Sequence, residues 1–191
     1  MRLFVALEIP AGVRENLAAL IRELQPLAPQ ARWIRAENLH VTLKFIGETL
    51  PEKLDAIRAA LSSVRGPGPI ALDFRGLGFF PDEKRPRIFW ADIAVGPEEQ
   101  AMARLARAIE DSLEPLGIAR EQRNFSAHLT LARFPQGPGN IEKLRAAARE
   151  RAALSFGRHT AREFCLFESD LQPAAAKYTR LAAYPLAREE G

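Results

Sequence analysis

The sequence HVTL occupies residues 40–43, and a second stretch of the same pattern, HLTL, occupies residues 128–131. Each reads His-x-Thr-x inside an apolar, β-prone run, at 39–46 and at 127–134. Residues i and i+2 of a strand point to the same face, so each copy is expected to place an imidazole beside a hydroxyl. The two apolar residues of each copy would face the opposite, buried side. The repeat therefore predicts two halves, each presenting one His–Thr pair.

The order of the predicted elements repeats in the same way. Apolar periodicity predicts helices at 12–24, 49–64, 98–116 and 140–151, and strands at 2–9, 32–34, 39–46, 70–80, 87–95, 126–134, 156–171 and 178–186. Each half then has a helix, a motif strand, a second helix and a pair of strands. The short connections within the strand pairs favour antiparallel pairing.

This order predicts the α+β class, with two similar lobes related by a pseudo-two-fold. Antiparallel sheets would face a central cleft and helices would cover the outside. We expect one bilobal domain over residues 1–191, made of two interleaved half-repeats. Thr49 and Glu52 have the spacing of a capping box at the start of the second helix, and Asn140 can cap the last one.

Composition restricts the class of protein further. The chain of 191 residues carries a formal net charge of +3 with a pI of about 9.3, and most of its basic residues are arginine. This fits either a solvated basic surface or contact with nucleic-acid phosphate. The single cysteine, Cys165, lies in an apolar run and predicts a buried structural thiol. No signal peptide or membrane-spanning run is evident, so we expect a cytoplasmic protein that does not bind a membrane.

Two facing His–Thr pairs suit acid–base chemistry at phosphorus. One neutral imidazole could take a proton from an attacking water while the other, protonated, gives one to the leaving oxygen. Attacking and leaving oxygens lie roughly in line through phosphorus, so the two groups must oppose one another. Thr42 and Thr130 could donate hydrogen bonds to non-bridging oxygens. His40 and His128 lack the further ligands of a zinc site, so we expect neither metal nor cofactor.

A structural alternative remains for each motif. A lone His-x-Thr in a strand is more often a buried histidine that is hydrogen-bonded to the backbone, but two equivalent copies favour the functional interpretation. His159 has no such counterpart, and we interpret it as surface or structural.

The chain resembles the two-histidine (2H) phosphoesterase superfamily, and within it the bacterial and archaeal RNA 2′,3′-cyclic phosphodiesterases, historically called 2′-5′ RNA ligases. The resemblance covers nearly the whole chain and is carried by RLFVAL at 2–7, WIRAENLHVTLKFIGE at 33–48, RPRIFW at 85–90, HLTLAR at 128–133 and LFES at 166–169. It implies hydrolysis of an RNA terminal 2′,3′-cyclic phosphate to a 2′-phosphomonoester. By position, His40 matches the proton donor and His128 the proton acceptor, although the near-equivalent halves would allow the reverse.

The resemblance also implies substrate contacts five residues after each histidine. Phe45 matches a base-stacking aromatic residue and Arg133 a phosphate-contacting arginine. Strict alternation puts an i+5 residue on the face opposite the histidine, so both roles require a bulge, a strand end or a long side chain. A core position for Phe45 and a surface ion pair for Arg133 are the alternatives. By the same alternation Lys44 shares the histidine face, as a cleft residue or, more often, a solvated one.

The sequence thus predicts an enzyme, an RNA 2′,3′-cyclic 3′-phosphodiesterase. Its partner would be RNA or a nucleotide with a 2′,3′-cyclic phosphate end, and we expect a monomer because the two-fold is internal. One alternative is a 2′-5′ RNA ligase that uses the same site. Another is a non-catalytic nucleotide- or RNA-binding module, for which Trp33 and Trp90 would be candidate contacts, although both are expected in the core.

Overall fold

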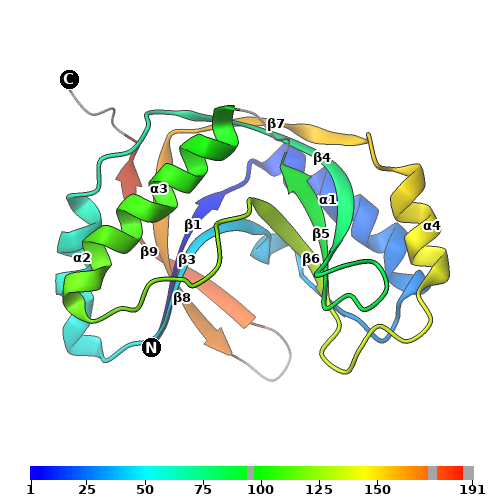
Figure 1. Ribbon diagram of the computed structural model, residues 1–191, viewed down its shortest axis with the longest axis horizontal. Helices are drawn as coiled ribbons and strands as arrows, with labels where there is room; N and C mark the ends of the chain where they lie inside the picture. Colours follow the sequence, from blue (N-terminus) through cyan, green and yellow to red (C-terminus); the bar gives the residue numbers. More distant parts are fainter. Residues whose placement is uncertain (94–96, 172–175, 187–191) are drawn as a thin grey trace.

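The computed structural model describes residues 1–93, 97–171 and 176–186. Its α-helices are separated along the chain by single strands or by runs of consecutive strands (Figure 1). In order they are β1 (Arg2–Glu8), α1 (Ala11–Leu24), η1 (Gln25–Leu27), β2 (Arg32–Trp33), η2 (Ala36–Asn38), β3 (His40–Glu48), η3 (Pro51–Lys53), α2 (Leu54–Ser62), β4 (Ile70–Phe80), β5 (Ile88–Ile93), α3 (Pro97–Leu113), η4 (Glu114–Leu116), β6 (His128–Arg133), α4 (Glu142–Glu150), β7 (Ser155–Ala161), β8 (Glu163–Leu171) and β9 (Ala176–Pro185). The η elements are short 3₁₀ helices.

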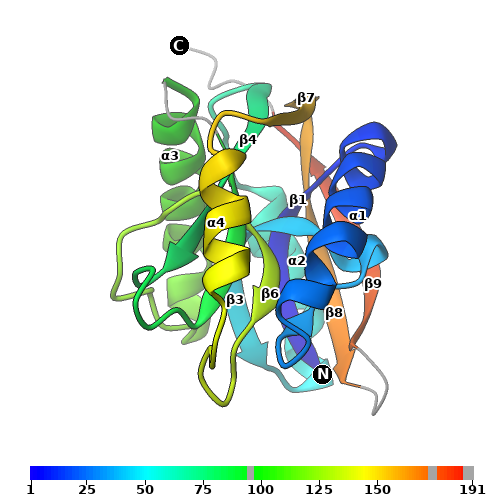
Figure 2. The ribbon, with the colours of Figure 1, turned by 90° about the vertical axis from the view of Figure 1, so that its right-hand side faces the viewer.

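The strands form two antiparallel sheets. Sheet A has the order β3-β1-β8-β9, and sheet B has the order β2-β6-β5-β4-β7. Each motif strand pairs with the strand that precedes the nearest upstream α-helix: β3 with β1, which precedes α1, and β6 with β5, which precedes α3. The motif strands β3 and β6 themselves lie side by side where the two sheets meet (Figures 1 and 2). The two lobes thus bring both His-x-Thr-x copies to one central place.

The four α-helices cover the outer faces of the sheets in two pairs, α2 with α3 and α1 with α4. Helices α2 and α3 pack together, with α2 against β9 of sheet A and α3 against β3 of sheet A and also against β4 of sheet B. Helices α1 and α4 lie over sheet B, against β7 and β4 (Figures 1 and 2). The helix that follows β1 of sheet A therefore covers sheet B, and the helix that follows β5 of sheet B covers sheet A. This exchange gives the α+β fold of two similar lobes that the sequence predicts.

A continuous apolar core lies between the helices and the sheets. Odd-numbered β1 residues, Leu3, Val5 and Leu7, belong to it, as do Val41 and Leu129 between the histidine and threonine of each motif. Phe4 and Ala6 of β1 instead form a second, smaller cluster on the other face of sheet A, with the buried Cys165 and with Phe167. Sheet A is therefore apolar on both faces, and its second face is the one that carries His40.

The predicted elements agree with the observed ones apart from their ends and from the single strand expected at 156–171, which was wrong: the chain passes from one sheet to the other at Arg162, so that β7 belongs to sheet B and β8 to sheet A. The strand expected at 87–95 is β5, and residues 94 and 95 lie outside the described part of the chain. The capping box was wrong: the Thr49 hydroxyl donates to the Gly47 carbonyl (3.3 Å), and the helix opens through a 3₁₀ turn at Pro51 without a side-chain cap. The N-cap residue of α4 is Ile141 and not the predicted Asn140, although the Asn140 side-chain oxygen accepts from the first helical amide, that of Glu142, at 3.2 Å. In the described residues no helix is both long and apolar enough to cross a membrane.

Candidate active site

Both motif strands carry a β-bulge at the same place. In β3, Thr42 pairs with Ala6 and Lys44 with Val5, so Leu43 has no opposite residue. In β6, Thr130 pairs with Trp90 and Ala132 with Phe89, so Leu131 is skipped. Two consecutive residues then point into the core in each strand, 43–44 and 131–132, and all four side chains are buried. A bulge reverses the alternation beyond it.

The bulges carry both i+5 residues onto the faces that hold the histidines. Phe45 pairs with Phe4, two residues along β1 from Ala6, which faces Thr42. Arg133 pairs with Ile88, two residues along β5 from Trp90, which faces Thr130. The core alternative for Phe45 is wrong, because 51% of its surface is exposed. We call the combined surface the motif face: His40, Thr42 and Phe45 of β3 with His128, Thr130 and Arg133 of β6.

The two imidazoles are held by equivalent hydrogen bonds. His40 Nδ1 lies 2.7 Å from the Asn38 carbonyl, and His128 Nδ1 lies 2.9 Å from the Ser126 carbonyl. A carbonyl oxygen only accepts, so Nδ1 carries the proton in each ring. Nε2 is then the nitrogen without a proton in the neutral form of each ring. The backbone two residues before each histidine thus fixes both its orientation and its tautomer.

Aromatic rings enclose His40. The Phe4 ring centroid lies 4.8 Å from that of His40, and Tyr178 of β9 meets the imidazole edge-on at 5.3 Å. This burial is the main reason that the pKa of His40 falls to about 4, and the positive charges of Arg133 and His128 lower it further, against the effect of the Asn38 carbonyl. Free His40 is therefore neutral at pH 7. The same influences show that Arg133 and His128 lie within electrostatic reach of His40.

His128 has a more open setting on sheet B. Trp90 approaches it edge-on, with ring centroids 6.4 Å apart, and Asp92 is its neighbour across the β5–β6 pair. Partial burial raises the pKa of Asp92, although the amide of Ile93 and the charge of His128 act in the opposite direction. Trp90 lies on the face of Thr130 and not in the main core, so the core prediction was wrong for it. Trp33 does pack against the core, and its indole donates to the Ala28 carbonyl at 3.0 Å.

Lys44 was also predicted wrongly. It is neither solvated nor on the motif face, because the bulge at Leu43 turns it into the protein, where only 2% of its surface is exposed. Its ammonium donates to Glu110 of α3 (3.0 Å) and to the Ala119 carbonyl (2.7 Å). His159, by contrast, is partly buried in β7 opposite Leu72, as expected of a structural residue.

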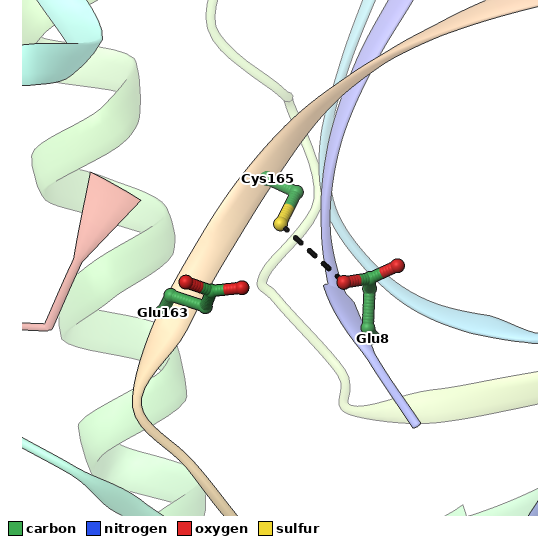
Figure 3. A group of neighbouring side chains, drawn as sticks. All are labelled: Glu8, Glu163 and Cys165. Carbon is green, nitrogen blue, oxygen red and sulfur yellow. Dashed lines mark hydrogen bonds between the residues drawn. The ribbon is translucent and has the colours of Figure 1, made fainter. Parts of the chain in front are cut away.

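A group of possible metal ligands lies near His40 on sheet A. Figure 3 shows Glu8, Glu163 and Cys165, whose candidate ligand atoms lie within 4.8 Å of one another. Arg180 already pairs with both carboxylates, at 2.9 and 3.4 Å. Burial, followed by the charges of the two glutamates, raises the pKa of the Cys165 thiol to about 11, so the thiol is protonated at neutral pH. We interpret the group as an acidic pair bridged by Arg180.

A cavity of about 180 Å³ extends from Glu8 of this group to His40, lined among others by Asn38, Tyr178 and Arg180. Sequence reasoning missed these neighbours of the histidine. One signal for an aromatic setting of His40 is Phe4, because it is the one aromatic residue in β1, whose other apolar residues are aliphatic. The short polar residues two positions before each histidine, Asn38 and Ser126, offer another.

The chain belongs to the family described as LigT like phosphoesterases, whose sequence model matches residues 7–90 and again 94–178. A protein of Archaeoglobus fulgidus named RNA 2′,3′-cyclic phosphodiesterase is 34% identical over 184 residues, which cover 96% of this chain and 99% of the relative. A Thermus thermophilus protein of the same name is 31% identical over all of this chain and 93% of its own length.

Solved structures agree with this assignment. The crystal structure of TT0787 from Thermus thermophilus superposes with a TM-score of 0.80 at 28% identity over the whole of both chains. That of Escherichia coli LigT complexed with 3′-AMP has a TM-score of 0.79 at 24% identity over 98% of each chain, which shows a common fold.

Proposed function

We propose that this protein hydrolyses RNA 2′,3′-cyclic phosphate ends to 2′-phosphomonoesters. The main support is the matched geometry of the two motifs: two imidazoles with equivalent Nδ1 bonds to carbonyl oxygens, each beside a threonine, on motif strands that lie side by side. The relatives named RNA 2′,3′-cyclic phosphodiesterase support the same reaction.

In the proposed reaction, a water oxygen attacks phosphorus while the bond from phosphorus to the 3′ oxygen breaks. His128 Nε2 accepts the proton of the water, and His40 Nε2 donates a proton to the leaving 3′ oxygen. Thr42 and Thr130 donate hydrogen bonds to the non-bridging oxygens, where negative charge has to be stabilised. Arg133 adds a charge-assisted contact to the phosphate, and Phe45 offers an exposed ring for a base. No step requires a metal ion or cofactor.

The donor role of His40 requires help from the substrate. With a pKa of about 4, His40 is almost entirely deprotonated at pH 7 in the free protein. A phosphodiester anion bound next to the imidazole raises this pKa, because the negative charge favours the imidazolium. Proton donation by His40 is therefore coupled to substrate binding, whereas in the reverse role of proton acceptor the neutral His40 of the free protein would already be in the required form.

The proposal is tested with a short RNA that ends in a 2′,3′-cyclic phosphate, in the presence of EDTA. Wild type is expected to form the 2′-phosphate, identified against 2′- and 3′-phosphate standards. His40→Ala and His128→Ala should each reduce the rate by on the order of 10²- to 10⁴-fold. His159→Ala is the matched control, because it removes the remaining histidine from β7 and should leave the rate unchanged.

Activity that needs added metal, or that survives both motif substitutions, would contradict the mechanism. Joining of the cyclic end to a 5′-hydroxyl RNA in preference to hydrolysis would identify a 2′-5′ ligase. Binding without turnover would identify a binding module. The proposal includes a monomer, which light scattering after size exclusion can test, and the cytoplasmic location stays a prediction.

A further inference from the structure

We infer that Lys44, in the first motif strand, positions the segment that leads into the second motif and thereby sets His128. This inference adds a positioning residue to the proposed function and rests on it only for the kinetic test. The segment, residues 117–127, connects η4 to β6 and contains neither helix nor strand. Its last residues supply the Ser126 carbonyl that holds His128 Nδ1.

The contacts of Lys44 are concentrated at the start of this segment. Its ammonium donates to the Ala119 carbonyl at 2.7 Å and to Glu110 Oε1 at 3.0 Å, and Glu121 Oε1 lies 3.9 Å away. Glu110 Oε1 in turn accepts from the Glu121 amide at 2.7 Å. Among the described residues Lys44 is the one charged side chain in the buried class. A buried cation with these partners fixes the backbone at 119–121 far more firmly than an exposed ion pair would.

The charge state of Glu110 suits its role as the partner of Lys44. Partial burial is the strongest single influence on its carboxyl and raises its pKa, yet the bonds from the Glu121 amide and from Lys44 together bring the pKa below its ordinary value. The carboxylate therefore stays ionised at neutral pH and keeps both bonds. Helix α3, the first motif strand and the segment before the second motif meet at this one oxygen.

The first motif is supported from the other side. Strand β2, which leads through η2 to His40, pairs with β6 so that Trp33 lies opposite Ala132, and the Ile34 amide donates to the Leu131 carbonyl at 2.8 Å. These two β6 residues form the bulge of the second motif, as Leu43 and Lys44 form that of the first. Each bulge thus anchors the segment that leads to the other histidine. Backbone hydrogen bonds from β6 hold the segment that leads to His40, and the Lys44 side chain holds the segment that leads to His128.

The test separates positioning from stability with two variants. Lys44→Met removes the cation but leaves Glu110 without its partner, so it can also destabilise the fold. Lys44→Met with Glu110→Gln removes both charges, and glutamine still accepts from the Glu121 amide. We expect the double variant to regain stability but to keep a kcat on the order of 10- to 100-fold below wild type, with a KM within about threefold. Lys53→Met is the control, since exposed Lys53 bonds the Leu116 carbonyl (3.3 Å) just before the segment.

Two further readouts do not depend on the reaction. Amide hydrogen exchange at 119–128 should be faster in the double variant than in wild type and unchanged in Lys53→Met. The imidazole NMR signals of His128 should shift while those of His159 stay in place. Recovery of kcat together with stability, or unchanged exchange in this segment, would overturn the inference. If wild type fails to hydrolyse cyclic phosphates, the proposed function fails, while exchange and NMR still decide the role of Lys44.

Discussion

Phe45 and Arg133 occupy equivalent places in the two motif strands, each five residues after its histidine and each brought to the motif face by a one-residue bulge. The two positions differ in chemistry: one side has an exposed aromatic ring, and the other has a guanidinium whose charge reaches both His40 and Tyr178. The lobes are thus similar in backbone and different in what they offer a substrate, as expected if one holds a base and the other a phosphate.

Arg133→Met is expected to lower kcat/KM on the order of 10- to 100-fold, because a hydrogen bond to a charged phosphate contributes about 1.5–3 kcal/mol. It should also raise the pKa of His40, since the Arg133 charge lowers it in wild type. Steady-state kinetics and a proton NMR titration check the two effects. Arg104→Met, an exposed position on α3, is the control and should change neither. A titration of His40 that is unchanged by Arg133→Met would contradict the proximity of the two groups.

Phosphate binding is expected to raise the pKa of His40 from about 4 toward neutrality. The measurement is an NMR titration of the imidazole in the free protein and with saturating nucleoside 2′-monophosphate, with His40→Gln to assign the signal. If the ligand leaves the pKa near 4, His40 cannot be the proton donor at neutral pH, and the acid and base roles have to be exchanged.

The free energy of unfolding should depend on pH through the same residue. The folded-state pKa of His40, about 4, lies below its ordinary value of 6.5, so between these values the unfolded chain binds more protons than the folded one. The stabilisation is complete above pH 6.5 and is lost as the pH falls toward 4. Urea unfolding at pH 7 and pH 4 should therefore show wild type losing about 3 kcal/mol more than His40→Gln. Equal losses in the two proteins would contradict the burial of His40.

Gly78→Ala is expected to disturb the sheet B side of the motif face. A Cβ at this position would lie 2.8 Å from Trp90 Cε2 and closer still to Cζ2, so the indole beside His128 would have to move. Overpacking of this kind costs about 1–3 kcal/mol in the free energy of unfolding. Trp33→Phe leaves Trp90 as the remaining tryptophan, so its fluorescence reports the displacement. Gly12→Ala in α1, with nothing within 4 Å of the new Cβ, is the control and should not destabilise.

The sequence was sufficient for the fold class and for the pairing of His40 with His128, because a repeated motif inside β-prone runs constrains both. It was insufficient where strand alternation breaks. Strict alternation put Lys44 on the wrong face and left Phe45 and Arg133 undecided, since a bulge has no mark in HVTLKF or HLTLAR beyond two consecutive buried residues. The rings around His40 were missed for a different reason: Phe4 and Tyr178 come from opposite ends of the chain and meet only through the order of sheet A.

Sheet A combines strands from the beginning and the end of the chain, and this has a consequence for synthesis on the ribosome. Strand β1, the first to emerge, lies between β3 and β8 in sheet A, and Phe4 pairs with Phe167. The nascent chain can form the β1–β3 pair early, but that pair stays an open edge until residues 163–171 leave the exit tunnel. Contacts this distant along the chain slow folding. An apolar strand edge is thus exposed until β8 has been synthesised, and this protein is expected to depend on late folding or on chaperones that shield nascent chains.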